Sequence, residues 1–589
     1  MEYGKIYHRA ALNDCYALNA QELEVSILTG YDVEKVFLCY GDPFSSGIMG
    51  GAERWSGEKE EMTDYVRLAE QKRYSIVIRP EYKRCKYYFE LHGGNEIIYY
   101  LENGFVDERR MTLPGRKEQC FFFPWMNPAD VNVTPDWVKD TVWYQIFPER
   151  FCNGDKENDS CYVKPWKCEK VHHLDRYGGD LRGIREKIPY LKDLGITGIY
   201  LTPIFMSPSN HKYNTTDYYK IDPEFGNDEE MQLLVKELHE AGIRLMIDAV
   251  FNHCGEEFAP WKDVMENGRN SRYFDWFFIE QFPFNTQTKD TRDKRYASFA
   301  FHGGMPKLNT NNPEVVTYFK ELCTYWIEKW DIDGIRFDVG NEVSHYFLKE
   351  LRKACKSAKS DIYLLGEIWH DSITWLMGDE YDSVMNYPFE QSINDFYVDD
   401  TRTAEDFEHD MNRCYSLYMK QTNQVLFNLL DSHDTERLAM RTKTEGAFFQ
   451  QLAILFTMPG TPCIYYGTEI RMPGGYDPDC RRCMPWEEIE SGKYQETIEK
   501  VKQLIALRKN VAMSAGDSVQ WVQDEKMPRV IHYVKKGQSG ENLHVLLNGE
   551  SRDILLSACG IQENQEMLFS YGLKEEKILA EGVCIWIEA

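Results

Sequence analysis

The run Gly334-Ile-Arg-Phe-Asp-Val339 is a short apolar strand that ends in a carboxylate, Asp338. About one strand–helix unit later, Tyr363-Leu-Leu-Gly-Glu-Ile-Trp369 repeats the arrangement with Glu367. A charged group at the end of a buried strand is costly unless it has a partner or a chemical role. We therefore expect both carboxylates to have a function.

Two more apolar runs of this kind flank the first pair. They are Leu245-Met-Ile-Asp-Ala-Val-Phe-Asn-His253 and Val425-Leu-Phe-Asn-Leu-Leu-Asp-Ser-His-Asp434. Four acid-tipped strands that alternate with helical stretches predict a barrel whose carboxylates gather at one rim. In such barrels the active site lies at the C-terminal ends of the strands.

Strand and helix patterns alternate from residue 137 onward, which predicts an α/β fold with a (β/α)8 TIM barrel. The third unit is interrupted, because about 60 residues separate His253 from the next helix near Glu314, too many for a plain loop. We expect a small inserted subdomain at the rim, about residues 253–313. The eight predicted strands are Val142–Phe147, Gly198–Thr202, Arg244–Phe251, Gly334–Val339, Ile362–Glu367, Ser383–Met385, Val425–Leu430 and Cys463–Tyr466.

The two ends of the chain read as β-structure. Residues 1–130 hold short β-branched or aromatic runs separated by Gly, Asp and Asn, the pattern of an N-terminal β-sandwich. The barrel is expected over 131–511, and a C-terminal antiparallel β-sandwich over 512–589. Aromatic residues of the first domain, among them Trp55, Tyr87, Tyr88, Tyr99 and Tyr100, are expected to divide between its core and its surface.

Composition excludes several partners. The net charge of −27 disfavours nucleic acid and anionic membranes, because both would repel the chain. No run approaches about 18 consecutive apolar residues, so no transmembrane helix is expected. The N-terminus has no apolar signal region, and 16 cysteines lack framework spacing. We expect reduced thiols and a cytoplasmic protein.

Six motifs in order resemble the α-amylase superfamily of retaining glycoside hydrolases. Two finer motifs, Met305-Pro-Lys-Leu-Asn309 and Val339-Gly-Asn-Glu342, are similar to those of the neopullulanase, cyclomaltodextrinase and maltogenic amylase group. That group typically carries an N-terminal β-domain. The six motifs are Gly198-Ile-Tyr-Leu-Thr-Pro203, Asp248-Ala-Val-Phe-Asn-His253, Gly334-Ile-Arg-Phe-Asp-Val339, Gly366-Glu-Ile-Trp369, Ser432-His-Asp434 and Gly460-Thr-Pro-Cys-Ile-Tyr-Tyr-Gly467.

Retaining glycosidases need one ionised carboxylate and one protonated carboxyl about 5 Å apart. We interpret Asp338 as the nucleophile and Glu367 as the acid/base. Arg336 lies two residues before Asp338 on the same strand, so both project to one side and the guanidinium would keep Asp338 ionised. Ile368 and Trp369 could form an apolar wall that raises the pKa of Glu367.

The resemblance implies further site residues. Asp434 would be the third carboxylate, which binds sugar hydroxyls and helps to distort the ring. His253 and His433 would donate hydrogen bonds to the reacting sugar. Asp248, in the middle of its strand, is expected to orient Arg336 and not to touch substrate.

Other positions match the substrate-binding residues of the family. Tyr213 matches the tyrosine that stacks on the sugar at the cleavage point, and His211 matches a neighbouring donor. Asp477 and Arg481 match a pair that grips the next glucose on the non-reducing side. Phe299 is expected to cover the acceptor side, with core packing in the inserted subdomain as the alternative.

An oxygen-rich cluster follows the first barrel strand and suits Ca²⁺. It lacks the spacing of an EF-hand, so composition alone leaves an Asx-rich turn as the alternative, and the resemblance favours a structural calcium site. Its predicted ligands are Asn153, Asp155, Asn158, Asp159, Gly178 and Asp180.

The resemblance implies hydrolysis of α-1,4-glucosidic bonds in cyclomaltodextrins, maltooligosaccharides and pullulan, with transglycosylation as a side activity. One alternative is an α-glucosidase or oligo-1,6-glucosidase on the same scaffold. Another is a non-catalytic relative, but such scaffolds carry a transmembrane helix and have lost the carboxylates that stand here at 338, 367 and 434. A homodimer is expected, because the N-terminal β-domain of one subunit commonly leans over the barrel of another in this group.

Overall fold

The computed structural model describes the chain as two compact units. The first unit contains Met1–Val133 together with Asp371–Asp379 and Arg402–Asn423, and the second contains the remainder. The N-terminal domain expected over 1–130 therefore takes in two later segments, to which it is hydrogen-bonded; Asn13 Nδ2, for example, donates to Ser416 O at 2.8 Å. The described residues are 1–45, 57–113, 119–166, 171–283, 288–512, 518–537, 540–562 and 565–588.

The N-terminal unit is built on two antiparallel sheets, as expected for a β-sandwich. Val25, Ile27 and Leu38 are fully buried in one core cluster, to which Val25 and Ile27 contribute from alternate positions of one strand. The first sheet is β1 (Cys15–Ala17), β2 (Leu23–Thr29), β6 (Lys72–Ile78) and β5 (Asp64–Arg67). The second is β4 (Glu58–Glu61), β3 (Lys35–Gly41), β7 (Cys85–Gly93), β8 (Glu96–Leu101) and β9 (Gly104–Asp107), with β10 (Phe121–Phe123) beside β7.

The aromatic residues singled out in this domain divide as expected. Tyr87 is fully buried, whereas Tyr88, Tyr99 and Tyr100 are half-buried. Trp55 lies outside the described residues.

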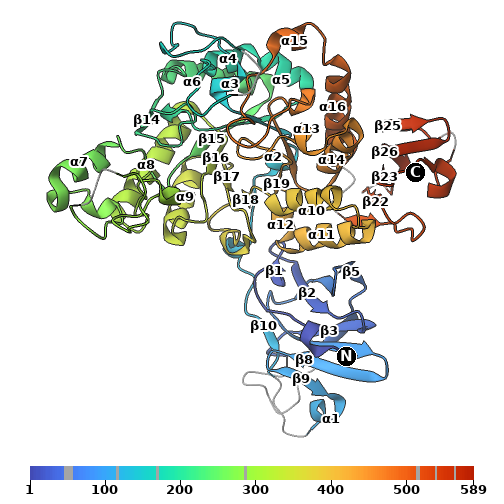
Figure 1. Ribbon diagram of the computed structural model, residues 1–589. Helices are drawn as coiled ribbons and strands as arrows, with labels where there is room; N and C mark the ends of the chain where they lie inside the picture. Colours follow the sequence, from blue (N-terminus) through green and yellow to red (C-terminus); the bar gives the residue numbers. More distant parts are fainter. Residues whose placement is uncertain are drawn as a thin grey trace. The chain divides into compact units, whose positions relative to one another are not determined.

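Eight parallel strands form the barrel sheet of the second unit, in the order β18-β17-β16-β15-β12-β11-β20-β19. A parallel bridge between Met385 and Phe427 joins the two ends, and Figure 1 shows β15 to β18 side by side. All eight predicted strands are confirmed. They are β11 (Trp143–Ile146), β12 (Gly198–Leu201), β15 (Arg244–Ala249), β16 (Gly334–Phe337), β17 (Tyr363–Gly366), β18 (Ser383–Val384), β19 (Phe427–Asn428) and β20 (Thr461–Tyr465).

Local signals start and stop the helices between these strands. The Asn227 side chain caps α6 by accepting from Glu230 N at 2.9 Å, and Gly242 ends it in the left-handed region at φ +79°. The main helices are α4 (Leu181–Glu186), α5 (Ile188–Leu194), α6 (Asp228–Ala241), α8 (Pro313–Trp330), α9 (His345–Ala358), α10 (Tyr387–Val398), α14 (Glu445–Thr457) and α16 (Gln495–Leu507).

The insertion after β15 contains α7 (Ala259–Asn267) and short irregular segments up to α8. Isolated antiparallel bridges connect it, including His253 to Lys307 and Phe277 to Leu308. These bridges bring the end of the insertion back to the rim residues that follow β15.

The C-terminal region is one antiparallel sheet in its described residues, not the two-sheet sandwich that we expected. The buried helix α14 supplies a second layer: Gln450 Nε2 donates to Asn548 O at 2.9 Å and to Gly582 O at 3.1 Å. A helix from the barrel thus takes the place of a second sheet. The strands are β21 (Val519–Trp521), β22 (Val530–Lys536), β23 (Asn542–Asn548), β26 (Lys577–Glu588), β24 (Ile554–Leu555) and β25 (Phe569–Lys574).

Two further expectations concern the whole chain. In its described part, no helix combines the length and apolarity that a bilayer crossing requires. The cysteines within the described residues are free thiols, most of them buried.

Candidate active site

Arg336 on β16 connects three predicted site carboxylates. Its side chain is fully buried, and Nη1 lies 2.9 Å from both oxygens of Asp248 and 2.9 Å from Asp338 Oδ1. Nη2 lies 2.9 Å from Glu367 Oε1, although without the alignment of a hydrogen bond. The acids on or directly after three neighbouring parallel strands, β15, β16 and β17, thus surround one guanidinium.

Asp248 is held by more than Arg336. Its Oδ2 accepts a hydrogen bond from Tyr200 at 2.6 Å and one from Tyr213 at 3.0 Å. The side chain of Asp248 is fully buried, which agrees with the expectation that it orients Arg336. It also fixes the hydroxyl of Tyr213, the residue predicted to stack on the sugar.

Glu367 is oriented by two N–H donors. The backbone N–H of Val339 donates to Oε2 at 3.0 Å, and the Trp369 indole donates to Oε1 at 3.3 Å. The Trp369 ring stacks on Tyr387 with centroids 3.7 Å apart and planes within 7°. Trp369 is nevertheless 51% exposed, so part of it can contact a ligand.

Crowding of the carboxylates shifts their protonation. Burial raises the pKa of Asp338 well above its usual range, Arg336 opposes this, and Glu367 and Asp248 add to it. This corrects the expectation that Arg336 alone would keep Asp338 ionised, because burial and the two neighbouring acids outweigh one guanidinium. Burial likewise raises the pKa of Asp248 to about 6 against the opposing charge of Arg336. One guanidinium cannot neutralise three acids, so the cluster favours retention of a shared proton. A retaining glycosidase needs such a proton before substrate cleavage.

The predicted third carboxylate, Asp434, belongs to a second polar group at the rim. Arg481 Nη2 lies 2.9 Å from Asp434 Oδ1, and its Nη1 lies 2.8 Å from Asp477 Oδ1. Its Nε donates to the His433 carbonyl at 2.8 Å. Asp434 itself is exposed, and its Oδ2 lies 3.1 Å from His433 Nε2.

The predicted histidines are neutral hydrogen-bond donors. Burial lowers the pKa of His211 and of His253 to about 3, and lowers that of His433 well below its usual value. In each ring Nδ1 faces an N–H group, so the remaining proton is on Nε2. The facing groups are Tyr213 N at 3.1 Å from His211, Asn252 Nδ2 at 3.3 Å from His253 and Gln145 Nε2 at 2.7 Å from His433.

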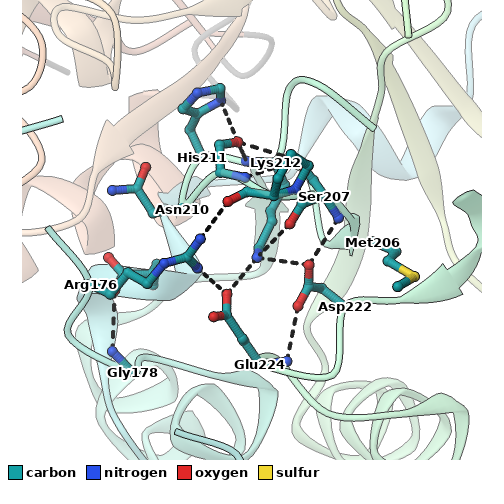
Figure 2. Close-up of polar contacts among 12 residues, drawn as sticks. Arg176, Gly178, Met206, Ser207, Asn210, His211, Lys212, Asp222 and Glu224 are labelled. Carbon is teal, nitrogen blue, oxygen red and sulfur yellow. Dashed lines mark hydrogen bonds and ion pairs between the residues drawn. The ribbon is translucent and has the colours of Figure 1, made fainter. Parts of the chain in front are cut away.

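A buried ion cluster supports the loop that carries His211 and Tyr213 (Figure 2). Lys212 is fully buried with φ +63°, a strained conformation for a residue other than glycine. Its ammonium lies 2.8 Å from Asp222 Oδ2 and 2.8 Å from Glu224 Oε2. Lys212 lies between His211 and Tyr213 in the sequence. Its two ion pairs therefore hold the positions of both neighbours.

Tyr213 and Phe299 each stack on a predicted site histidine. The Tyr213 ring is parallel to His433 within 7° at 5.4 Å, and its hydroxyl lies 2.5 Å from His433 Nε2. Phe299 stacks on His253 at 4.7 Å. The structure therefore brings Phe299 to the site rather than into the core of the insertion.

Comparison with known proteins gives the family. The model for the α-amylase catalytic domain matches residues 145–521, and the model for the α-amylase N-terminal Ig-like domain matches residues 1–127. The chain belongs to the α-amylase family. It is a glycoside hydrolase of that family by the same comparison.

Relatives confirm the narrower resemblance within the α-amylase family. A cyclomaltodextrinase of Geobacillus thermopakistaniensis is 44% identical over 550 residues, 92% of this chain and 90% of the relative. Neopullulanase 2 of Thermoactinomyces vulgaris is 41% identical over 561 residues, 94% of this chain and 92% of the relative. A solved structure of a cyclomaltodextrinase, 36% identical, matches with a TM-score of 0.89 and covers 100% of both chains.

The oxygen-rich cluster of this α-amylase family member lies in the loop after β11. Asn153 Oδ1 and Asn158 Oδ1 are buried and have no hydrogen-bond partner among the described residues, and Asn153 Nδ2 donates to Asp159 Oδ1 at 2.9 Å. Gly178 has φ +82°, and a side chain there would overlap Asp159. Two orphaned amide oxygens and a carboxylate fit a hard cation.

Asp155 and Asp180, like Asp159, already accept hydrogen bonds within the protein. Asp180 caps α4 by accepting from Gly183 N at 2.6 Å, and it also accepts from Asp155 N at 2.8 Å. Asp155 Oδ1 accepts from Glu157 N at 3.1 Å. Among the described residues no three His, Cys, Asp or Glu side chains cluster as a metal site, so an ion here would depend on amide and carbonyl oxygens.

Sequence reasoning did not identify Tyr200, Tyr387 and Lys212 as parts of the site. Tyr200 lies within the motif Gly198–Pro203, so its inward direction could have been inferred from strand alternation. Tyr387 starts α10 and reaches the site by stacking on Trp369. Lys212 lies in a loop and belongs to the site through its ion pairs with Asp222 and Glu224. Lys212 lies between two predicted binding residues, and this position in the sequence could have indicated that Lys212 supports the site.

Proposed function

We propose that this protein is a retaining hydrolase of α-1,4-glucosidic bonds in cyclomaltodextrins, maltooligosaccharides and pullulan, with transglycosylation as a side reaction. The observation that carries the proposal is the contact of Arg336 with Asp338, Glu367 and Asp248 at the barrel rim. The names of the two relatives, a cyclomaltodextrinase and a neopullulanase, support the substrate class.

The proposed reaction has two displacements. Asp338 attacks the anomeric carbon while Glu367 protonates the leaving oxygen, which gives a covalent glycosyl–enzyme. Glu367, now ionised, takes a proton from water or from a sugar hydroxyl, and that oxygen replaces Asp338. Water gives hydrolysis and a sugar acceptor gives transglycosylation. Two inversions retain the α-configuration.

The surrounding groups select and distort the sugar. Tyr213 offers an aromatic face whose hydroxyl is held by Asp248 and His433. Asp434 and the Nε2–H group of His253 bind hydroxyls of the reacting ring. The Nε2–H group of His433, which was also expected to bind the sugar, is directed at the Tyr213 hydroxyl. The exposed face of Trp369, beside Glu367, is placed to meet the leaving group or acceptor.

Early-time NMR of the products tests the reaction type. The first product is expected to be the α-anomer, and a β-anomer would contradict double displacement. Initial rates on γ-cyclodextrin, pullulan, starch and isomaltose test the substrate class. Faster hydrolysis of isomaltose than of cyclodextrin would favour the alternative, an oligo-1,6-glucosidase.

A structural Ca²⁺ is the second part of the proposal. Asn153, Asn158 and Asp159 would hold it through side-chain oxygens and Gly178 through its carbonyl. The support is that the two amide oxygens have no hydrogen-bond partner within the described ranges. The ion would brace the loop after β11 against the residues before α4 and take no part in bond cleavage.

We also propose a homodimer in the cytoplasm. The dimer rests on the family expectation and on the N-terminal Ig-like domain, and the compartment on the free thiols of the described cysteines. Light scattering at micromolar concentration tests the first, and a monomer would contradict it. If the domain restricts access, removal of residues 1–130 should raise the ratio of starch to cyclodextrin hydrolysis.

A further inference from the structure

The residues after β15 pair with the end of the inserted subdomain. His253 and Lys307 form an antiparallel bridge. Leu308 N donates to Asn252 O at 3.0 Å, and Cys254 N donates to Pro306 O at 3.1 Å. This pairing brings Lys307 close enough for its ammonium to reach the Asn252 side chain.

Lys307 contacts two partners through its ammonium. It donates to Asn252 Oδ1, to Glu342 Oε2 at 3.0 Å and to the Glu342 carbonyl at 3.1 Å. An ammonium can only donate, so the atom of Asn252 that faces it must be the oxygen. The amide nitrogen of Asn252 therefore points the other way.

That nitrogen faces the imidazole of His253. Asn252 Nδ2 lies 3.3 Å from His253 Nδ1, and an amide NH₂ can only donate, so Nδ1 must accept. Burial, strengthened by the Lys307 charge, lowers the pKa of His253 to about 3, which keeps the ring neutral. The single ring proton is then on Nε2, which is buried and has no hydrogen-bond partner in the part of the chain that the structure describes.

We propose that Lys307 is a positioning residue that fixes the Nε2–H tautomer of His253 through the amide of Asn252. Lys307 touches no substrate in this assignment. Glu342 holds the ammonium, the ammonium orients the amide, and the amide selects the tautomer. His253 then offers a donor to a sugar hydroxyl or ring oxygen, and Phe299, stacked at 4.7 Å, holds the ring plane.

The two tautomers of a neutral imidazole differ little in free energy, so one hydrogen bond decides between them. Without Lys307 the Asn252 amide can rotate by half a turn, and its oxygen would accept from Nδ1–H. His253 would then present a bare Nε2, an acceptor, to the sugar. The role of His253 toward substrate rests on the proposed function, whereas the tautomer does not.

The tautomer can be measured directly. The protein is labelled with ¹⁵N-histidine and studied by long-range ¹H–¹⁵N NMR without substrate, with His253→Gln to assign the signal. We expect a protonated Nε2 and an unprotonated Nδ1 in the wild type. In Asn252→Asp the carboxylate accepts from the ring, so Nδ1 should become protonated. A protonated Nδ1 in the neutral wild-type ring, or an unchanged spectrum in Asn252→Asp, would overturn the proposal.

Lys307→Met tests the first link. We expect a mixed or reversed tautomer of His253, and retention of the wild-type signal would overturn the role of Lys307. Lys356→Met is the matched control, because Lys356 is equally exposed at 20% and pairs with Asp382 at 2.9 Å. Its removal should leave the His253 signal unchanged, and a change there would show that the signal reports only general loosening.

Activity separates this inference from the proposed function. Asn252→Asp should lower kcat/KM on maltooligosaccharides by about 10- to 100-fold, the loss expected for one misdirected buried hydrogen bond. A changed tautomer with unchanged kcat/KM would overturn the catalytic consequence. A wild-type protein with the expected tautomer but without glycosidase activity would instead overturn the proposed function.

Discussion

The backbone N–H of Val339 donates to Glu367 Oε2 at 3.0 Å, so the residue after the predicted nucleophile positions the predicted acid. Val339 has φ +47°, a left-handed conformation that β-branched residues rarely adopt. Strain of this kind persists only when surrounding contacts enforce it, and it gathers at functional sites. The turn after β16 therefore ties the two predicted catalytic carboxyl groups to one geometry.

Glu367→Gln should distinguish the role of the general acid from that of the nucleophile. Glutamine keeps an oxygen for the Val339 N–H, so the fold should survive, but it cannot protonate a leaving group. General acid catalysis contributes about 10²- to 10⁴-fold, so kcat on maltotriose should fall by that order. Hydrolysis of α-maltosyl fluoride, whose leaving group needs less protonation, should fall much less at the first step. Asp338→Asn should abolish hydrolysis of both substrates. If Glu367→Gln and Asp338→Asn lost activity on the fluoride to the same extent, the assignment of acid and nucleophile would be contradicted.

Asp248→Asn should move the acidic limb of the kcat/KM profile to lower pH. The anionic Asp248 disfavours ionisation of Asp338, so its removal lowers the pKa of Asp338. The rate should also fall by at least about 10-fold, because Arg336 and two tyrosine hydroxyls lose a partner. Asp333→Asn is the control: Asp333, just before β16, is buried and bound to Arg244 at 2.7 Å. Asp333→Asn should lower the stability of the protein and leave the acidic limb of the kcat/KM profile at the same pH.

Lys212→Met should weaken both stability and substrate binding. It leaves Asp222 and Glu224 without the buried ammonium, which typically costs about 3–5 kcal/mol, and it releases the loop with His211 and Tyr213. We expect a lower Tm and a higher KM for maltotriose. The double variant with Asp222→Asn should recover part of the Tm, because Asp222 loses its ammonium partner whereas Glu224 keeps its contact with Arg176. An unchanged KM in a folded single variant would argue against anchoring of the loop.

Chelation with EDTA should lower the Tm if the proposed calcium ion is bound, since a ligand of the native state stabilises it by mass action. Asp159→Asn should reduce the metal content and make the Tm insensitive to EDTA. Asp155→Asn is the comparison, because Asp155 caps its own turn at 3.1 Å. Equal metal content in wild type and Asp159→Asn would remove Asp159 from the site.

His8 should make the N-terminal unit sensitive to acid. Burial lowers the pKa of His8 to about 3, while an unfolded histidine titrates near about 6.5. Between these values the unfolded chain binds the extra proton, so stability falls as the pH drops through the window, by up to about 1.4 kcal/mol per pH unit. His8→Gln should reduce this slope, measured by urea unfolding at pH 5 and 7. An identical slope would show that His8 does not contribute.

Strand-end motifs were sufficient to predict most of the barrel and its rim. Arg336, Asp338 and Glu367 stand at strand positions where alternation and direction are local properties of the chain, and the structure brings them together. The C-terminal region was less predictable. Its strands were recognised, but their sequence did not show that α14 would supply the second layer.

The sequence by itself determined the eight parallel strands, the acids at their ends and the resemblance to a known family, because strand period, helix caps and short motifs are set by neighbouring residues. Only the tertiary structure decided which side chains contact one another around those acids. The proton position on His253 depends on Lys307, the support of Tyr213 on Asp222 and Glu224, and the stacking of Trp369 on Tyr387. These contacts join residues that are not neighbours within one helix turn or one strand, and hydrogen-bond direction is set only when the atoms meet.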